Sequence, residues 1–261
     1  MKKFEWLKVE REEGILIVTL NNPEKLNVLT TKIISELRDA IQEVYDNSEI
    51  TGVIITGTEE KTFAAGADVR EIANLNELNG RKFSENGQEA FALIESCHKP
   101  ILAAVNGDAL GAGCELALAC HLRIASENAV FGLPEASIGI IPGFGGTQRL
   151  TQLIGKARAL ELMITAEKLT ATEAQQIGLV NHVVKDPEAL VVRSKNILKK
   201  IIANGPIAIG MLINCVNAVC NPCENGYQTE ANSFANCCKT EDFKEGSTAV
   251  FEKRKPQFKG S

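Results

Sequence analysis

Residues 101–125 read ILAAVNGDALGAGCELALACHLRIA and form the most apolar stretch of the chain. Polar residues interrupt it at intervals, whereas a membrane span needs about 20 nearly uninterrupted apolar residues. We therefore expect a buried core segment, with a strand over 100–105, a helix over 111–119 and a strand over 122–125. Strands alternating with helices are typical of an α/β domain.

The same alternation continues on both sides of this segment. Over residues 27–46, apolar residues such as Ile33, Leu37 and Ile41 recur at helical spacing, and Thr30 or Thr31 is the expected N-cap. Further strands are expected over 14–20, 53–57 and 129–131, with a helix over 85–96. Strand signals then become rare, and helices are expected over 147–162, 172–177, 187–202, 207–219 and 245–253. The pattern predicts an α/β core followed by a helical C-terminal third.

Composition and charge exclude several classes of protein. The 261 residues are 44% hydrophobic and 23% charged, which is ordinary for a globular chain and excludes a disordered or coiled-coil one. The formal net charge of −5 argues against nucleic acid as the main partner. The N-terminal MKKFEW is not followed by an apolar segment typical of a secretion signal, so we expect a cytoplasmic protein with no membrane partner.

Eight cysteines raise the question of a metal site. Four are single, and the others form Cys220-Asn-Pro-Cys223 and the pair Cys237-Cys238. Zinc sites usually repeat the CxxC or add paired histidines, and all three histidines lie elsewhere in the sequence. We expect buried, reduced thiols and no metal ligands.

Glycine-rich loops supply candidate backbone donors. The chain lacks the glycine pattern of a dinucleotide fold, the GK[ST] of a P-loop and the GxSxG of a serine hydrolase. The N–H of Ala112 would lie at the start of the 111–119 helix, where no intrahelical acceptor exists. Ala67, in a small-residue loop, could supply a second donor, and two donors on one oxygen make an oxyanion hole. Small residues at these positions could equally serve only close packing.

Two glutamates lie among apolar neighbours. Glu115 belongs to the predicted 111–119 helix, and Glu135 follows Pro134 in a turn after a short strand. A carboxylate in such surroundings must be paired, hydrogen-bonded or raised in pKa. Two carboxylates that hold one water suit its addition or removal by acid–base catalysis. Either could instead be a structural carboxylate bonded to backbone amides, and Glu135 could cap the next turn.

Four stretches together resemble the crotonase superfamily, specifically its enoyl-CoA hydratases. They are FAAGAD at 63–68, ALGAGCELALAC at 109–120, FGLPEASIGIIPGFGGTQRL at 131–150 and EGSTAVFEKRKPQFKG at 245–260. The chain departs from many relatives by carrying Ala112 where they have glycine, but alanine keeps the backbone N–H that the family uses.

The resemblance implies a spiral of ββα repeats over residues 1–195 that holds an acyl-CoA site. It implies a helical trimerisation region over 196–261, in a homotrimer or a hexameric dimer of trimers. It further implies hydration of 2-enoyl-CoA thioesters, a step of fatty acid metabolism among other pathways, with no cofactor besides the coenzyme A of the substrate. Glu115 and Glu135 fall on the two catalytic glutamates, and Ala67 and Ala112 on the oxyanion-hole donors.

Substrate contacts are expected from the same match. They comprise Ala65, Ala67, Asp68, Val69, Arg70, Ala112 and Lys253. We favour a phosphate contact for Arg70, whereas the run 253–255 could equally be a solvated surface.

Other activities of this superfamily fit the residues less well. A Δ3,Δ2-enoyl-CoA isomerase often keeps a single acid, and a dehalogenase uses an aspartate that has no counterpart here. The RNA-binding branch carries a lysine-rich first helix, whereas the helix expected here is net negative. A hydratase is therefore the leading prediction, and an isomerase or another acyl-CoA enzyme of this fold is the alternative.

Overall fold

The chain is described by a computed structural model covering residues 2–58 and 61–261. A six-stranded sheet has the order β1-β2-β3-β5-β7-β10, and a four-stranded sheet has the order β4-β6-β8-β9. The first sheet comprises β1 (Leu7–Glu12), β2 (Ile15–Leu20), β3 (Gly52–Gly57), β5 (Ile101–Val105), β7 (Leu122–Ser126) and β10 (His182–Val184). The second comprises β4 (Thr62–Ala64), β6 (Asp108–Leu110), β8 (Val130–Gly132) and β9 (Lys168–Thr170).

The helices are α1 (Thr31–Asp46), α2 (Val69–Ile72), α3 (Glu77–Glu95), α4 (Ala112–Ala119), α5 (Gly146–Ile154), α6 (Lys156–Thr165), α7 (Ala171–Gln176), α8 (Pro187–Ile202), α9 (Pro206–Ala218), α10 (Gly226–Cys237) and α11 (Glu241–Glu252). Two short 3-10 helices, η1 (Pro23–Lys25) and η2 (Pro134–Ile138), lie in loops.

The chain builds both sheets in step, which gives the expected spiral. The strands β3, β5 and β7 are parallel neighbours in one sheet, and β4, β6 and β8 are parallel neighbours in the other. Each repeat therefore adds one strand to each sheet before a helix follows. The predicted ββα spiral is confirmed.

Burial on both faces explains the continuous apolar runs of the central strands. In β3, Val53 and Ile55 belong to the main core under α1, α3 and α4, while Ile54 faces a second core with Leu190 and Leu198 of α8. Parallel strands covered on both faces are therefore near-continuous apolar runs. Thr30 caps the N-terminus of α1, and its side chain accepts from the Ile33 N–H at 3.3 Å.

Several elements differ from the prediction. The helix expected over 147–162 is two helices, because Gly155 between α5 and α6 has φ +82° and ψ 156°. The helix α3 begins at Glu77, before the expected residue 85, and Asn76 caps it. Neither α10 nor the strands β1, β4, β6, β9 and β10 were expected. Short strands and a helix with a weak apolar face carry little periodic signal.

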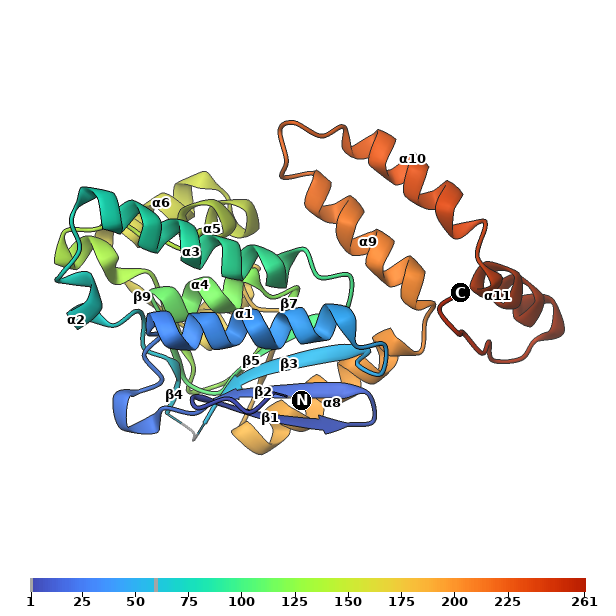
Figure 1. The fold of residues 1–261 in the computed structure, drawn as a ribbon, viewed down its shortest axis with the longest axis horizontal. Helices are drawn as coiled ribbons and strands as arrows, with labels where there is room; N and C mark the ends of the chain where they lie inside the picture. Colours follow the sequence, from blue (N-terminus) through green and yellow to red (C-terminus); the bar gives the residue numbers. More distant parts are fainter. Residues whose placement is uncertain (1, 59–60) are drawn as a thin grey trace.

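The last three helices form an arm beside the core (Figure 1). The helices α9 and α10 pack on each other, and α11 lies at the far end of the arm. The expected boundary at residue 195 falls inside α8, which packs on the six-stranded sheet. The arm thus leaves the core after Ile202.

The thiols are only partly buried, which corrects the expectation for them. All eight cysteines are free; Cys97, Cys114 and Cys120 are buried, but the sulfurs of the arm are half-buried or exposed. Cys220 and Cys223 are exposed in the loop between α9 and α10, and Cys238 is exposed at the end of α10.

Candidate active site

Two loops meet at one edge of the four-stranded sheet. Residues 65–68 follow β4, and Gly111 follows β6, its parallel neighbour. Gly111 has φ +50°, and a Cβ there would lie 2.8 Å from Oε1 of Glu135 and 3.6 Å from Cα of Gly66. These short distances show that three segments distant in sequence, around Gly66, Gly111 and Glu135, lie side by side.

A cavity of 1170 Å³ opens where these segments meet. Of the predicted site residues, its lining includes Ala65, Ala67, Val69, Ala112, Glu115 and Glu135. Much of the remaining wall is apolar and comes from η2 and the residues after it, and from Phe83 of α3. The segment 74–81 contributes Leu75, Asn76, Glu77, Gly80 and Arg81 to the wall. The chain therefore brings both glutamates and both candidate N–H donors to one cavity.

Glu115 is buried in α4, a helix whose eight residues are all buried. Its side-chain Oε1 accepts from the N–H of Phe144 at 2.8 Å and from that of Gly146 at 2.7 Å. Burial raises its pKa to about 7, and the nearby Glu135 adds to this effect, while the two N–H groups and Arg149 oppose it. Glu115 therefore titrates close to neutral pH.

Glu135 lies in η2, directly after β8. Its Oε2 is buried, and no residue in the described parts of the chain hydrogen-bonds to it. Burial raises the pKa of this carboxyl as well. An unpartnered buried oxygen at a cavity wall is available to a ligand, and a protonated Oε2 could donate to it.

Three predicted contacts lie apart from the cavity wall. The Asp68 side chain accepts from the Arg70 N–H at 2.9 Å and caps α2. Arg70 is exposed beside that cap. Lys253 ends α11, and α11 and α2 occupy opposite ends of the molecule in Figure 1. Within one chain, Lys253 therefore does not reach this cavity.

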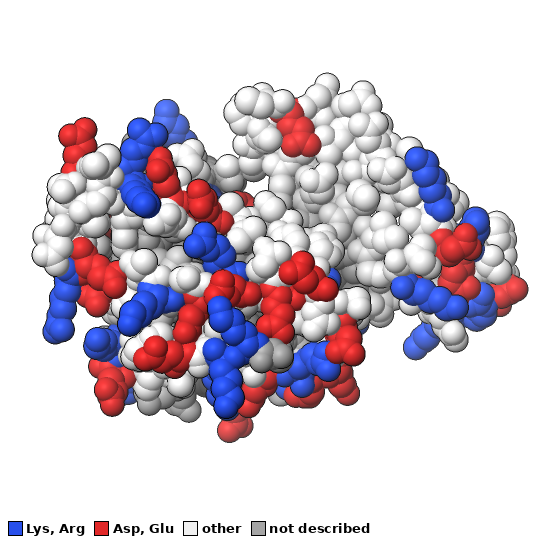
Figure 2. Space-filling model, in the orientation of Figure 1, with Lys and Arg blue, Asp and Glu red and all other residues white. Residues whose placement is uncertain are grey.

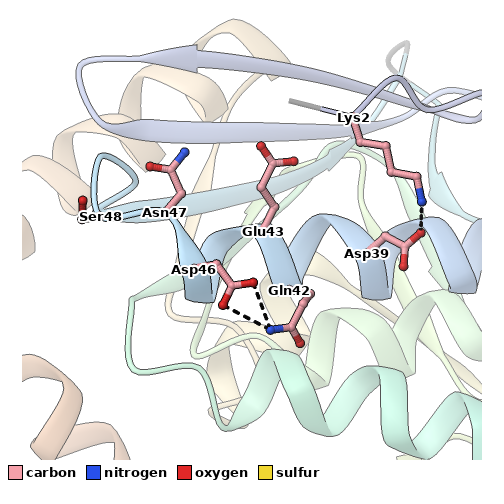
Figure 3. Close-up of a pocket in the computed structure, with 7 residues that line it drawn as sticks. All are labelled: Lys2, Asp39, Gln42, Glu43, Asp46, Asn47 and Ser48. Atoms are coloured by element: carbon pink, nitrogen blue, oxygen red, sulfur yellow. Dashed lines mark hydrogen bonds and ion pairs between the residues drawn. The ribbon is translucent and has the colours of Figure 1, made fainter.

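A second hollow, on the outer face of α1, lacks comparable chemistry. In Figure 3 the Lys2 amine points to Asp39 and the Gln42 amide points to Asp46. This hollow is lined by charged and amide side chains, without an apolar wall that could hold an acyl group. Asp39, Glu43 and Asp46 line this hollow, so the outer face of α1 is rich in carboxylates, which repel phosphate.

The sequence prediction missed the residues that hold Glu115 in place. They are the loop 143–146 and Arg149 behind it, which pairs with Glu95 at the end of α3. The GFGG at 143–146 is a visible loop signal, but its partner cannot be inferred from it.

Comparisons with known proteins identify the family. A model of the enoyl-CoA hydratase/isomerase family matches residues 10–261. The chain belongs to the enoyl-CoA hydratase/isomerase family. It is 44% identical over 249 residues to a short-chain-enoyl-CoA hydratase of Clostridium acetobutylicum, covering 95% of each chain. It is 43% identical to a crotonyl-CoA hydratase of Syntrophomonas wolfei, covering 98% of each.

Solved structures show that this family member also shares the hydratase fold. An enoyl-CoA hydratase from Bacillus anthracis superposes with a TM-score of 0.92 at 37% identity, covering 98% of this chain and all of that one (100%). A Geobacillus kaustophilus homologue superposes at 0.93 with 36% identity. The crotonase-type fold expected from the four sequence stretches is confirmed.

Two further observations concern partners of this enoyl-CoA hydratase/isomerase family member. Within residues 2–58 and 61–261, no group of three or more His, Cys, Asp or Glu side chains is placed to hold a metal ion. None of the helices described there is by itself long and apolar enough to cross a membrane; only α8 and α9 together, bent by 105°, pass on length and composition.

Proposed function

We propose that this chain adds water across the 2,3 double bond of short 2-enoyl-CoA thioesters and releases 3-hydroxyacyl-CoA. The observation that carries the proposal is the pair Glu115 and Glu135, one buried and one half-buried carboxyl, which line one cavity and both have raised pKa values. Relatives named short-chain-enoyl-CoA hydratase and crotonyl-CoA hydratase support the reaction and the short acyl chain.

The two glutamates differ in their hydrogen bonds, and this difference assigns one as base and the other as acid. Oε1 of Glu115 accepts two N–H groups, which favours the ionised form, so we assign Glu115 as the base. It takes a proton from the water whose oxygen bonds to C3 of the substrate. Glu135, with its unpartnered Oε2, is the acid and gives its proton to C2. Dehydration reverses both transfers.

Electron density from the double bond moves onto the thioester oxygen as water attacks. We propose that the N–H groups of Ala67 and Ala112 receive this oxygen. Ala112 is the first residue of α4, so its N–H has no acceptor within the helix and lies at the positive end of the helix dipole. Donors aimed at developing charge contribute about 3 kcal/mol each to such reactions.

We also make proposals for how the coenzyme A part of the substrate is bound, for the cofactor requirement and for the cellular setting. We propose that exposed Arg70 contacts a phosphate of coenzyme A, and that Lys253 reaches that end only from another copy of the chain. The chemistry uses carboxyls and backbone N–H groups, so we expect no cofactor besides the coenzyme A of the substrate. Free thiols throughout are consistent with a reducing, cytoplasmic setting.

We also propose that the chain assembles as a trimer or a dimer of trimers through its arm. The exposed apolar side chains of α9 to α11 support this: Leu212, Val216, Val219, Tyr227, Phe234, Val250 and Phe251 are 65 to 87% exposed. In Figure 2 the surface over α9 and α10 carries little charge beside the densely charged core. Apolar surface of this extent is typical of a contact between subunits.

The test is hydration of crotonyl-CoA, followed as loss of the absorbance of the conjugated thioester. We expect wild-type protein to form 3-hydroxybutyryl-CoA. Glu135→Gln keeps the shape of the side chain but removes its proton transfer, so it should fold and lose turnover by about 10²–10⁴-fold. The exposed Glu24→Gln is the control and should match wild type.

An active Glu135→Gln enzyme would contradict the role of Glu135. Wild-type protein that binds a saturated acyl-CoA but leaves crotonyl-CoA unchanged would overturn hydration. A 3-enoyl-CoA substrate would then decide for or against the isomerase.

A further inference from the structure

The loop that holds Glu115 is itself held from behind. Phe144 donates its N–H to Glu115, and its carbonyl accepts from Nη1 of Arg149 at 2.8 Å. A Cβ at Gly145 would lie 2.4 Å from the same Nη1, so loop and guanidinium are in close contact. Both ends of Phe144 are therefore fixed, one by Glu115 and the other by Arg149.

Glu95 orients the guanidinium. Its Oε2 accepts from Nε of Arg149 at 3.1 Å and from Nη2 at 2.9 Å, which leaves Nη1 directed at Phe144. Arg149 is 8% exposed, whereas the Glu95 side chain is 35% exposed, so water reaches the pair from the Glu95 side only. An arginine is suited to this task because its planar fork donates in several fixed directions at once.

Glu95 is anchored through its own backbone. Its carbonyl accepts from the Asn217 side chain of α9 at 2.7 Å and lies 3.1 Å from Nε2 of His121. Since Nδ1 of His121 accepts from the Ile101 N–H, Nε2 carries the proton and donates to Glu95. The end of α3 thus has a defined position against the core and the arm.

The same helix also holds the start of the loop. The Ser84 hydroxyl donates to the Gly143 carbonyl at 2.5 Å, and the Gln88 amide donates to it at 3.1 Å. The Phe144 ring packs against Phe91 at 5.6 Å between centroids. Side chains along one face of α3 therefore hold the loop at one end, and Arg149 holds it at the other.

We propose that Arg149, oriented by Glu95, is a positioning residue for hydration: it holds the loop 143–146 so that two N–H groups fix Glu115 as the base. The proposal rests on the function proposed above. The Arg149 guanidinium binds the same residue that donates its N–H to the Glu115 carboxylate. Arg149 acts through Phe144 and Gly146, and Glu95 acts through Arg149.

The charged groups around Glu115 determine whether loss of Arg149 raises or lowers the pKa of Glu115. Glu135 from η2 raises the pKa of Glu115, whereas Arg149 from α5 lowers it. The adjacent Cys114 stays neutral because burial raises its pKa to about 12, and the Glu95 carboxylate is paired with Arg149. Loss of Arg149 removes a positive charge and loosens two N–H donors, so both changes raise the pKa of Glu115.

The experiment compares Arg149→Met, Arg149→Lys and Glu95→Gln with wild type. Arg11→Met is the matched control, since Arg11 pairs with Glu49 on the surface of the core. Three quantities are measured: kcat on crotonyl-CoA, binding of the unreactive butyryl-CoA, and the carboxyl ¹³C titration of Glu115, assigned by its loss in Glu115→Gln.

For Arg149→Met we expect kcat to fall by about 10–100-fold, as for other small misplacements of a catalytic group. Binding of butyryl-CoA should change by less than about threefold, and the Glu115 titration should move up by about half a pH unit or more. Arg149→Lys keeps the charge, so its titration should return towards wild type while kcat stays reduced. For Glu95→Gln we expect kcat and the Glu115 titration to lie between those of wild type and Arg149→Met. Arg11→Met should match wild type.

An unchanged Glu115 titration together with unchanged kcat per folded molecule overturns the proposal. If Arg149→Met fails to fold, Arg149→Lys and Glu95→Gln decide by the same readouts. If wild type does not hydrate crotonyl-CoA, the proposed function fails, whereas the titration still tests the positioning of Glu115.

Discussion

Glu115 lies where a carboxylate has almost no contact with water, at 1% exposure. Two N–H groups stabilise its charged form, but burial outweighs them, and its pKa rises to about 7. The same feature that gives a base near neutral pH therefore costs folding stability. At the residue scale, catalysis and stability make opposite demands on this side chain.

This conflict predicts how Glu115→Gln affects stability. The folded pKa of about 7 lies above the ordinary value of 4.5, so the wild-type carboxyl contributes fully to stability below pH 4.5 and loses that contribution as pH rises through 7. Glutamine keeps the oxygen that accepts both N–H groups and has no charge to bury. At pH 8 we expect the variant to be more stable by about 3 kcal/mol, and near pH 4.5 by little.

Urea unfolding at pH 5 and pH 8 checks this expectation. Glu24→Gln, an exposed change of the same kind, should show no such difference between the two pH values. A Glu115→Gln protein with equal gains at both values would mean that charge burial is not the cause.

At the scale of elements, α3 connects the fold to the site. One face of this helix packs into the core, and the same helix supplies Ser84, Gln88 and Glu95 to the loop 143–146 and Arg149. Gly87 lies on that face and leaves room for the Phe144 ring: a Cβ there would be 2.1 Å from it. The helix therefore helps to set the position of Glu115 through the loop 143–146.

Two glycines of α3 make a matched pair for testing this role. Gly87→Ala should displace the Phe144 ring, destabilise the protein by about 1–3 kcal/mol and lower kcat. Gly80→Ala meets nothing closer than 3.9 Å and should instead stabilise the helix by about 0.5–1 kcal/mol. Thermal unfolding and crotonyl-CoA kinetics measure both effects, and equal behaviour of the two variants would contradict a role for Gly87.

At the scale of the molecule, the arm leaves apolar helical surface uncovered. Leu212 and Val216 lie one turn apart on α9 and are 65% and 66% exposed. In a single chain this apolar surface stays in contact with water. Burying it between subunits would contribute about 25 cal/mol of free energy for each Å². The charge contrast between arm and core favours the arm as the contact region of the proposed assembly (Figure 2).

Charges placed on that surface should therefore separate the subunits. We expect wild type to elute as a trimer or hexamer in size-exclusion chromatography with light scattering, and Leu212→Glu with Val216→Glu to shift it towards monomer. Asn196→Glu instead adds a charge at an exposed position of α8, outside the arm, and should leave the assembly intact. Monomeric wild-type protein would refute the proposed assembly.

The sequence by itself determined which segments are buried and which local motifs they carry. Buried parallel strands are near-continuous apolar runs, so β3 and β5 were predictable from residues 53–57 and 100–105, and β7 from residues 122–125 although Arg123 interrupts it. The positions of Glu115 and Glu135 were predictable too, because a charged residue in an apolar run is visible without knowing its partners.

Only the tertiary structure decided which groups surround those glutamates. Phe144 and Gly146 are 29 and 31 residues from Glu115, and Arg149 is 54 residues from its partner Glu95. It also decided that Asp68 caps a helix, and that several thiols of the arm are exposed. Periodicity shows that one face of an element is buried, but the residue that packs against that face is chosen by contacts distant in sequence.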